Sequence, residues 1–99
     1  KKNYIEGIKT CNLAFYRKDC VEINGFNNCM IGWGREDTEF VVRLLNNGVS
    51  RKNVHFNLIQ FHLWHTNSSR EFISKNDEIL NNTIKNSLTW SDGGLNKFL

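Results

Sequence analysis

The residues that could do chemistry gather at positions 32–39, which read Gly-Trp-Gly-Arg-Glu-Asp-Thr-Glu. Glycine lets the main chain come close to a ligand or take a positive φ, so Gly32 and Gly34 would let the Trp33 ring lie flat at a surface. An aromatic face beside carboxylates is a common way to hold a sugar, because the ring covers C–H faces and the carboxylates accept hydroxyl protons. The residue types therefore favour a saccharide site.

A helix is expected to carry the carboxylates of this segment. Apolar residues recur at helical spacing from position 40 to 45 and an Asn-Asn-Gly stop follows, which predicts a helix over about 36–47. Glu36, Asp37 and Glu39 would lie in its first turn, where each acidic group is worth about 0.3–1 kcal/mol against the helix dipole. That electrostatic role could alone explain one or two of the acids, but it leaves the glycines and Trp33 unexplained.

Two short elements are expected before this helix. The apolar and aromatic segment 11–16 predicts a strand, in which Asn12 is the one polar residue and would face either neighbouring backbone or a ligand. Residues 17–24 predict a short helix with Asp19 as its N-cap and Gly25 as its stop.

Two longer elements are expected after it. The alternation of apolar and polar residues from 54 to 61 predicts a half-buried strand. Residues 70–90 predict an amphipathic helix with Phe72, Ile73, Ile79, Leu80, Ile84 and Leu88 on roughly one face, and Ser-Asp-Gly-Gly at 91–94 breaks it.

A second chemical signal, His62-Leu-Trp-His65, follows the predicted strand. Two imidazoles three residues apart can reach one metal ion from a turn, and imidazole suits Mn, Fe, Ni or Zn. The alternative is that one or both histidines cap the strand end and contact backbone carbonyls.

Composition excludes several classes of protein. The chain of 99 residues is enough for one small domain, and its formal charge of +3 is spread over scattered Lys and Arg residues, which argues against nucleic-acid binding. No apolar run approaches the ~18 residues that span a bilayer. Cys11, Cys20 and Cys29 lack the C-x-x-C spacing of zinc or redox sites, so we expect free, buried thiols in a reducing compartment.

Taken together and in order, these motifs resemble the C-terminal region of an inverting family-2 glycosyltransferase of the GT-A fold, of the galactosyltransferase-related type. The resemblance covers roughly residues 10–67 and implies an α/β fold. Residues 1–99 would then form one partial domain, the C-terminal half of a nucleotide-diphospho-sugar transferase with few strands and two or three helices. The motifs are Asn-Leu-Ala-Phe-Tyr-Arg-Lys-Asp at 12–19, Val-x-Ile-Asn-Gly-Phe at 21–26, Gly-Trp-Gly-x-Glu-Asp at 32–37, Arg-Leu at 43–44, Gly48 and His-x-x-His at 62–65.

The resemblance implies roles for two of these acids and for Trp33. Asp37 would be the catalytic base that takes a proton from an acceptor hydroxyl while that oxygen attacks the anomeric carbon. Glu36 would hold acceptor hydroxyls and Trp33 would be the platform under a sugar. We also count Gly34, Asn12 and Arg35 as candidate substrate-binding residues; Arg35 stands where the family often has glycine, and its cation could alter acceptor choice or meet a phosphate.

The resemblance also implies a divalent metal cofactor, Mn²⁺ or Mg²⁺, that neutralises the departing nucleotide diphosphate. His65 aligns with the family's ligating histidine and His62 with a ligand position three residues earlier. The family's Asp-x-Asp motif does not occur in this sequence. We therefore expect the chain to be a part of a longer enzyme, inactive without the donor-binding half.

The partners implied are a nucleotide-sugar donor, UDP-hexose above all, and a saccharide acceptor in polysaccharide or glycoconjugate synthesis. The expected location is the bacterial cytoplasm. Peripheral association of the full-length protein with the inner face of the membrane is an alternative that the resemblance leaves open. An exposed sheet edge would also allow a homodimer of this segment.

Two other classes of function stay open on the sequence. One is a carbohydrate-binding or oligomerisation module that keeps Trp33 and the carboxylates without chemistry. The other is a small metallohydrolase in which Asp37, His62 and His65 surround one ion.

Overall fold

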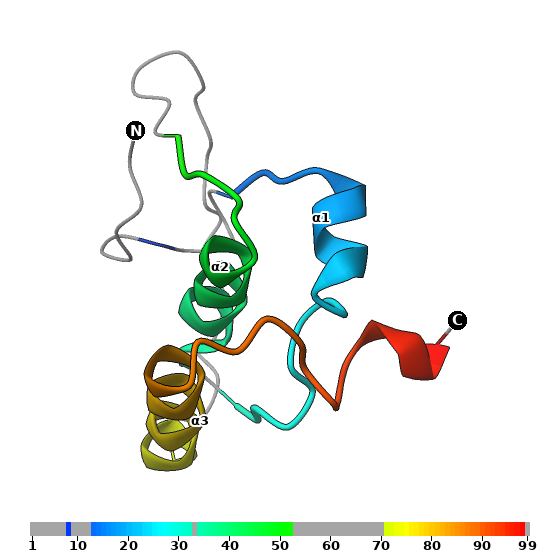
Figure 1. Cartoon of the computed structure of the whole chain (residues 1–99). Helices are drawn as coiled ribbons and strands as arrows, with labels where there is room; N and C mark the ends of the chain where they lie inside the picture. The colour runs from blue at the N-terminus through cyan, green and yellow to red at the C-terminus, as the bar shows by residue number, and fades with distance from the viewer. Residues whose placement is uncertain (1–7, 9–12, 33, 53–70, 99) are drawn as a thin grey trace, which may run out of the picture.

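Apart from one β-bridge residue, Arg51, the regular structure of the described residues is helical. The computed structural model describes residues 8, 13–32, 34–52 and 71–98. Its elements are α1 (Arg17–Glu22), α2 (Glu36–Asn46), α3 (Ile73–Lys85) and a terminal 3-10 turn, η2 (Leu95–Phe98). In Figure 1, α2 lies in the middle, with α1 to one side of it and α3 below, and α2 packs directly against α3. No helix among these residues is long and apolar enough to cross a membrane.

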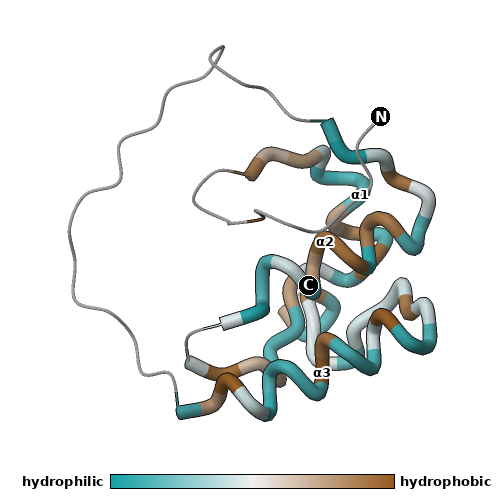
Figure 2. The backbone as a smooth tube through the Cα atoms, turned by 90° about the vertical axis from the view of Figure 1, so that its left-hand side faces the viewer, coloured by the Kyte–Doolittle hydropathy of each residue, from teal (hydrophilic) through white to brown (hydrophobic). Residues whose placement is uncertain are grey.

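The core forms on the apolar face of α2. Phe40 is fully buried, and Val41 and Leu44 are each no more than 5% exposed, because their spacing places them on the side that faces the rest of the chain. Ile23 from the end of α1 joins them, and the ring of Phe26 stacks on Phe40 with centroids 4.1 Å apart. Figure 2 shows this hydrophobic stretch along α2 in brown.

All three α-helices of the described residues end in the same hydrogen-bonded motif. The residue after each C-cap has a left-handed backbone, with φ of 68° at Asn24, 88° at Gly48 and 50° at Ser87. The next N–H then reaches back to the helix and satisfies a carbonyl that would otherwise lack a partner, which is the Schellman arrangement. The bonds are Gly25 to Cys20 at 2.9 Å, Val49 to Leu44 at 3.0 Å and Leu88 to Thr83 at 3.1 Å.

The helix predicted over 70–90 is confirmed in kind but is shorter, and its inner face differs from the expected one. α3 buries Asn76, Leu80 and Thr83, whereas Ile84, expected on the apolar face, is 45% exposed. Thr83 lies inside because α2 presents the buried carboxylate of Glu39 there. Asn76 lies inside because it donates to the carbonyls of Ile31 and Gly34.

The predicted strand at 11–16 is wrong where it can be checked. Residues 13–16 have no regular structure; Tyr16 is extended but 76% exposed, and its carbonyl accepts the N–H groups of Asp19 and Cys20. An extended segment becomes a strand only when a neighbour pairs with its backbone, and here the segment leads into a helix instead. Tyr16 is also the N-cap of α1, so the prediction of Asp19 as N-cap is wrong, although the helix itself is confirmed.

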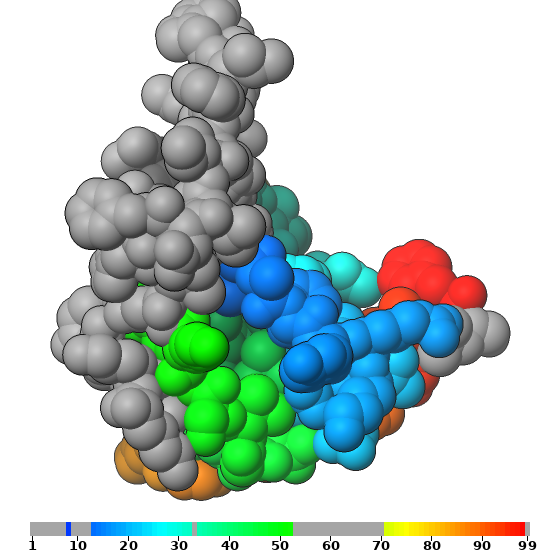
Figure 3. Space-filling view, turned by 90° about the horizontal axis from the view of Figure 1, so that it is seen from above, coloured from blue at the N-terminus to red at the C-terminus, as the bar shows by residue number. Residues whose placement is uncertain are grey.

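No strand occurs within residues 13–32, 34–52 and 71–98. The second predicted strand, at 54–61, lies outside the described residues, so the α/β character stays a prediction. Figure 3 shows the start of the described chain and α1, in blue, lying beside the green residues of α2 and the turn after it. This contact includes the pair Phe15 and Phe40, whose ring centroids are 4.9 Å apart.

The C-terminal segment returns to the end of α1. The Asn24 side chain donates to the Ser91 carbonyl at 2.5 Å, and its Oδ1 accepts the N–H of Asn96 at 2.7 Å. The Asn24 carbonyl accepts the N–H of Leu95 at 2.7 Å. The approach is so close that a Cβ at Gly94 would lie 2.0 Å from the Asn24 carbonyl oxygen, which explains the glycine.

The two described cysteines are free. Cys20 is half-buried and Cys29 is exposed, so the expectation of a buried thiol is wrong for Cys29. Cys11 lies outside the described residues.

Candidate functional site

The candidate site begins with a sharply turned backbone ahead of α2. Gly32 and Gly34 have φ of 72° and 120°, and Arg35, the N-cap of α2, has a left-handed φ of 72° as well. A Cβ at Gly34 would lie 3.2 Å from Cγ1 of Ile73 in α3, so both the backbone angle and the packing favour glycine there. The glycines therefore serve to fold this loop closely against α3.

Glu36 and Asp37 open the first turn of α2, where the positive end of the helix dipole favours acidic groups. Both side chains are partly exposed. Asp37 Oδ1 accepts the N–H of Thr38 at 2.8 Å, which restrains the carboxylate at the start of the helix. Glu36 Oε2 is shielded from solvent and has no hydrogen-bond partner within the described part of the chain. Two carboxylates are thus presented together at one helix end.

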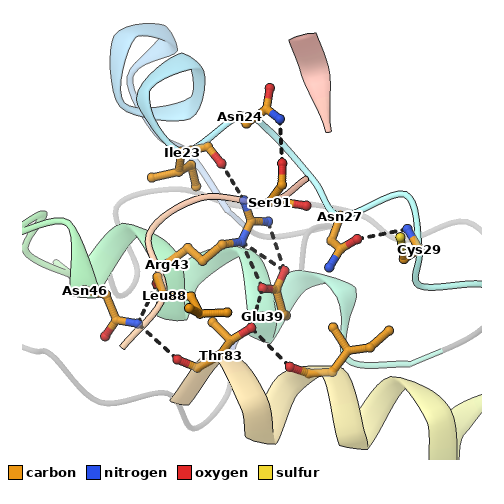
Figure 4. A network of polar contacts seen from close by, with 11 residues as sticks. Ile23, Asn24, Asn27, Cys29, Glu39, Arg43, Asn46, Thr83, Leu88 and Ser91 are labelled. Atoms are coloured by element: carbon orange, nitrogen blue, oxygen red, sulfur yellow. Dashed lines mark hydrogen bonds and ion pairs between the residues drawn. The ribbon is translucent and has the colours of Figure 1, made fainter. Parts of the chain in front are cut away.

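The third acid of the turn, Glu39, has a different environment, shown in Figure 4. It is 1% exposed and pairs with the fully buried guanidinium of Arg43, whose Nε and Nη2 each lie 2.9 Å from a carboxylate oxygen. Arg43 Nη1 donates to the Ile23 carbonyl at 2.6 Å, and the Thr83 hydroxyl lies 2.8 Å from Glu39 Oε2. Glu39 is therefore a structural carboxylate that joins the end of α1, α2 and α3.

Arg35 also contacts α3. Its Nε donates to Asp77 Oδ1 at 2.5 Å, and both side chains are a little over two-fifths exposed. An ion pair this exposed contributes about 0–1 kcal/mol, so it directs the Arg35 side chain more than it stabilises the fold.

Half of the predicted site can be placed. Gly34, Arg35, Glu36 and Asp37 are contiguous in the structure, in the loop and first turn of α2. Trp33, Asn12, His62 and His65 lie outside the described residues, so the expected proximity of Asp37 to the two imidazoles stays a prediction. Within the described residues no group of three or more His, Cys, Asp or Glu side chains could hold a metal ion.

Sequence reasoning named Glu39 in the first turn of the helix and Arg43 in the resemblance, but it did not predict that the two residues form a buried ion pair. Glu39 and Arg43 stand four residues apart within an otherwise apolar helix face, and this spacing of opposite charges was the available signal. Asn76 and Asn24 gave no such signal, because a buried asparagine has no distinctive spacing in sequence.

Comparison with known proteins identifies the family. A family model described as the N-terminal domain of galactosyltransferase matches residues 1–66. The chain belongs to this galactosyltransferase family. No curated protein and no solved structure matches the chain significantly.

The galactosyltransferase match covers the Gly-Trp-Gly loop, all of α2 and both histidines. It confirms the galactosyltransferase-related part of the resemblance, and therefore the prediction that the chain is part of a glycosyltransferase. Assignment to family 2 and to the C-terminal half of the enzyme stays a prediction; the matching model is itself described as an N-terminal domain. α3 and the C-terminal segment of this galactosyltransferase chain lie beyond the matched residues.

Proposed function

We propose that this chain forms the acceptor side of a metal-dependent, inverting glycosyltransferase. The enzyme would move a sugar, a hexose carried on UDP, from a nucleotide-diphospho-sugar to a saccharide hydroxyl. The observation that carries the proposal is the pair of partly exposed carboxylates, Glu36 and Asp37, at the start of α2 within the galactosyltransferase-matched residues.

Asp37 would act as the general base. Its carboxylate would take the proton from the acceptor hydroxyl as that oxygen bonds to the anomeric carbon and the nucleotide diphosphate leaves from the opposite face. Displacement from the opposite face inverts the anomeric configuration. The hydrogen bond from the Thr38 N–H to Asp37 Oδ1 supports this role, since it limits the orientations that the carboxylate can take.

The neighbouring residues would bind the acceptor. Glu36, whose side chain is partly exposed, would accept hydrogen bonds from sugar hydroxyls. Trp33 would cover a C–H face of the sugar, and Gly34 would let the backbone approach it. Arg35 would reach a hydroxyl or phosphate through its Nη groups, because Nε is engaged by Asp77.

The remaining candidates are Asn12 and the two histidines. Asn12 would donate or accept one hydrogen bond at the substrate. His65, and after it His62, would hold a Mn²⁺ or Mg²⁺ ion, which when bound neutralises charge on the departing diphosphate. Two imidazoles are an incomplete ligand set, so the other ligands would come from the Asp-x-Asp of a donor-binding half.

The biological setting proposed is polysaccharide or glycoconjugate synthesis in the bacterial cytoplasm or at the inner face of the membrane. It follows from the resemblance of the motifs to enzymes of that kind. An activity assay of the purified full-length protein with UDP-hexose donors and a panel of saccharide acceptors would identify the reaction.

Replacement of Asp37 tests the mechanism. Asp37→Asn in the full-length protein should lower kcat by about 100-fold or more, the usual contribution of a general base, with donor affinity unchanged. Asp92→Asn, an exposed acid of the C-terminal segment, is the matched control and should leave kcat at the wild-type value. Wild-type turnover by Asp37→Asn would remove Asp37 from the role of base.

A further inference from the structure

One side chain of α3 holds the loop that precedes α2 from both ends. Asn76 is 1% exposed, and its Nδ2 donates to the Ile31 carbonyl at 2.9 Å and to the Gly34 carbonyl at 3.0 Å. These two carbonyls bracket the segment 32–33 of the candidate site. A single amide thus fixes the entrance and the exit of the loop.

The chemistry of this contact requires the amide nitrogen. A carbonyl oxygen only accepts, so both bonds need a group with two N–H donors, and among uncharged side chains of this length asparagine alone supplies them. Asn76 Oδ1, by contrast, is buried and has no partner among the described residues. Leaving a buried acceptor without a partner costs stability, so the residue is better explained by what its donors hold than by its contribution to the core.

Two further contacts reach the same loop from the same face of α3. Ile73 packs at Gly34, and Asp77 pairs with Arg35. Ile73, Asn76 and Asp77 are spaced three and four residues apart, which places them together on one side of the helix. The loop therefore rests on the first two turns of α3, which lie after the residues matched by the galactosyltransferase model.

We propose that Asn76 is a positioning residue for the acceptor side of the enzyme. It sets the path of the backbone into α2, and through that path it sets where Glu36, Asp37 and Trp33 meet the acceptor. The inference deepens the proposed function and rests on it for its catalytic readout. The inference also makes α3 a support of the candidate site at the start of α2 rather than a peripheral helix of the domain.

The first test is kinetic and uses the full-length protein. Asn76→Asp is nearly isosteric and removes both N–H donors, while Asn76→Ala removes the amide and favours helix. Asn81 lies on α3 and is exposed, so Asn81→Asp and Asn81→Ala are the matched controls.

We expect KM for the acceptor to rise about tenfold in either Asn76 variant, because small misplacements of a reacting group are costly, and KM for the donor to stay unchanged. Asn76→Gln keeps both donors on a longer stem and should recover part of the loss. A residue that served only stability would lower the active fraction and leave both KM values alone. That result would overturn the inference.

The second test does not need activity. With Trp64→Phe and Trp90→Phe as the background, Trp33 is the one remaining tryptophan of this chain. Acrylamide quenching of its fluorescence should change in Asn76→Asp and Asn76→Ala and stay constant in the two Asn81 variants. If the wild type transfers no sugar, the proposed function fails, yet quenching still decides the role of Asn76. Equal quenching in all variants would show that Asn76 does not position the loop.

Discussion

Two acids of α2 that are two residues apart lie in opposite environments. A helix turns by about 100° per residue, so side chains at positions 37 and 39 point to nearly opposite sides. Asp37 is partly exposed at the candidate site, whereas Glu39 faces inward and is held by Arg43 and Thr83. Within one helical turn, helix geometry thus separates a partly exposed acid from a buried acid that holds the fold together.

The two free cysteines should differ in reactivity for a related reason. Burial raises the pKa of the Cys20 thiol, and the positive charge of Arg43 only partly offsets this. The thiolate is the reactive form, so at pH 8 we expect iodoacetamide to modify the exposed Cys29 faster than Cys20. Site-resolved mass spectrometry of the timed reaction measures both rates. In urea the two rates should converge, and equal rates in the folded protein would contradict the prediction.

The same shift fixes the sign of a pH effect on stability. Because the pKa of Cys20 is higher in the folded than in the unfolded chain, folding favours the neutral thiol. The contribution of the half-buried Cys20 thiol to the free energy of unfolding is complete below the thiol pKa of the unfolded chain, about 8.5, and decreases as the pH rises above that value.

At the scale of the elements, all three α-helices of the described residues end at a residue with a left-handed backbone. Three different residues, Asn24, Gly48 and Ser87, occupy the same left-handed position after a helix. Asn24 is needed there because its side chain binds the C-terminal segment. Ser87 is exposed and has no such role in the described contacts, so only its backbone angle matters.

Ser87→Gly should therefore stabilise the protein by about 0.5–1 kcal/mol, since glycine removes the strain of a left-handed L-residue. Gly48→Ala is the reverse change, at a position where an added Cβ would meet nothing within 4 Å. It should destabilise by about 1 kcal/mol. Urea unfolding of the two variants and the wild type provides the free energies, and a loss of stability in Ser87→Gly would contradict this account.

The helices were predictable from sequence because their signals are local. The spacing of Phe40 and Leu44 and the stop at Asn46-Asn47-Gly48 locate α2 to within one residue. The segment ending at Tyr16 has the composition of a strand, but a strand depends on a distant neighbour that sequence does not show. The polar inner face of α3 was missed for the same reason, since Thr83 is buried only because Glu39 lies opposite.

At the scale of the whole molecule, the buried ion pair of Glu39 and Arg43 connects the elements. One guanidinium binds the end of α1 and the carboxylate of α2, and that carboxylate contacts α3 through Thr83. Of the candidate site, sequence predicted the acids at the start of α2, but it could not predict these supports, because they come from residues 20 to 44 positions away.

A double-mutant cycle should show that this pair acts as a unit. Glu39→Leu or Arg43→Leu alone should each destabilise by about 3–5 kcal/mol, because each leaves a buried charge without its partner. The double variant should lose clearly less than the sum. The exposed pair Arg35 and Asp77, changed in the same way, is the control and should show a coupling of about 0–1 kcal/mol. Urea unfolding measures both cycles, and additive losses at Glu39 and Arg43 would refute the interpretation.

The bonds between Asn24 and Asn96 join positions that are 72 residues apart in the chain. Such a contact closes a long loop, and the entropy of that closure must be overcome before the bonds form. Local helices can appear early, whereas the return of the C-terminal segment to α1 waits until the intervening chain is arranged. We therefore expect this junction to complete late in folding, so that a nascent chain still tethered near residue 96 would hold its helices before it holds its final shape.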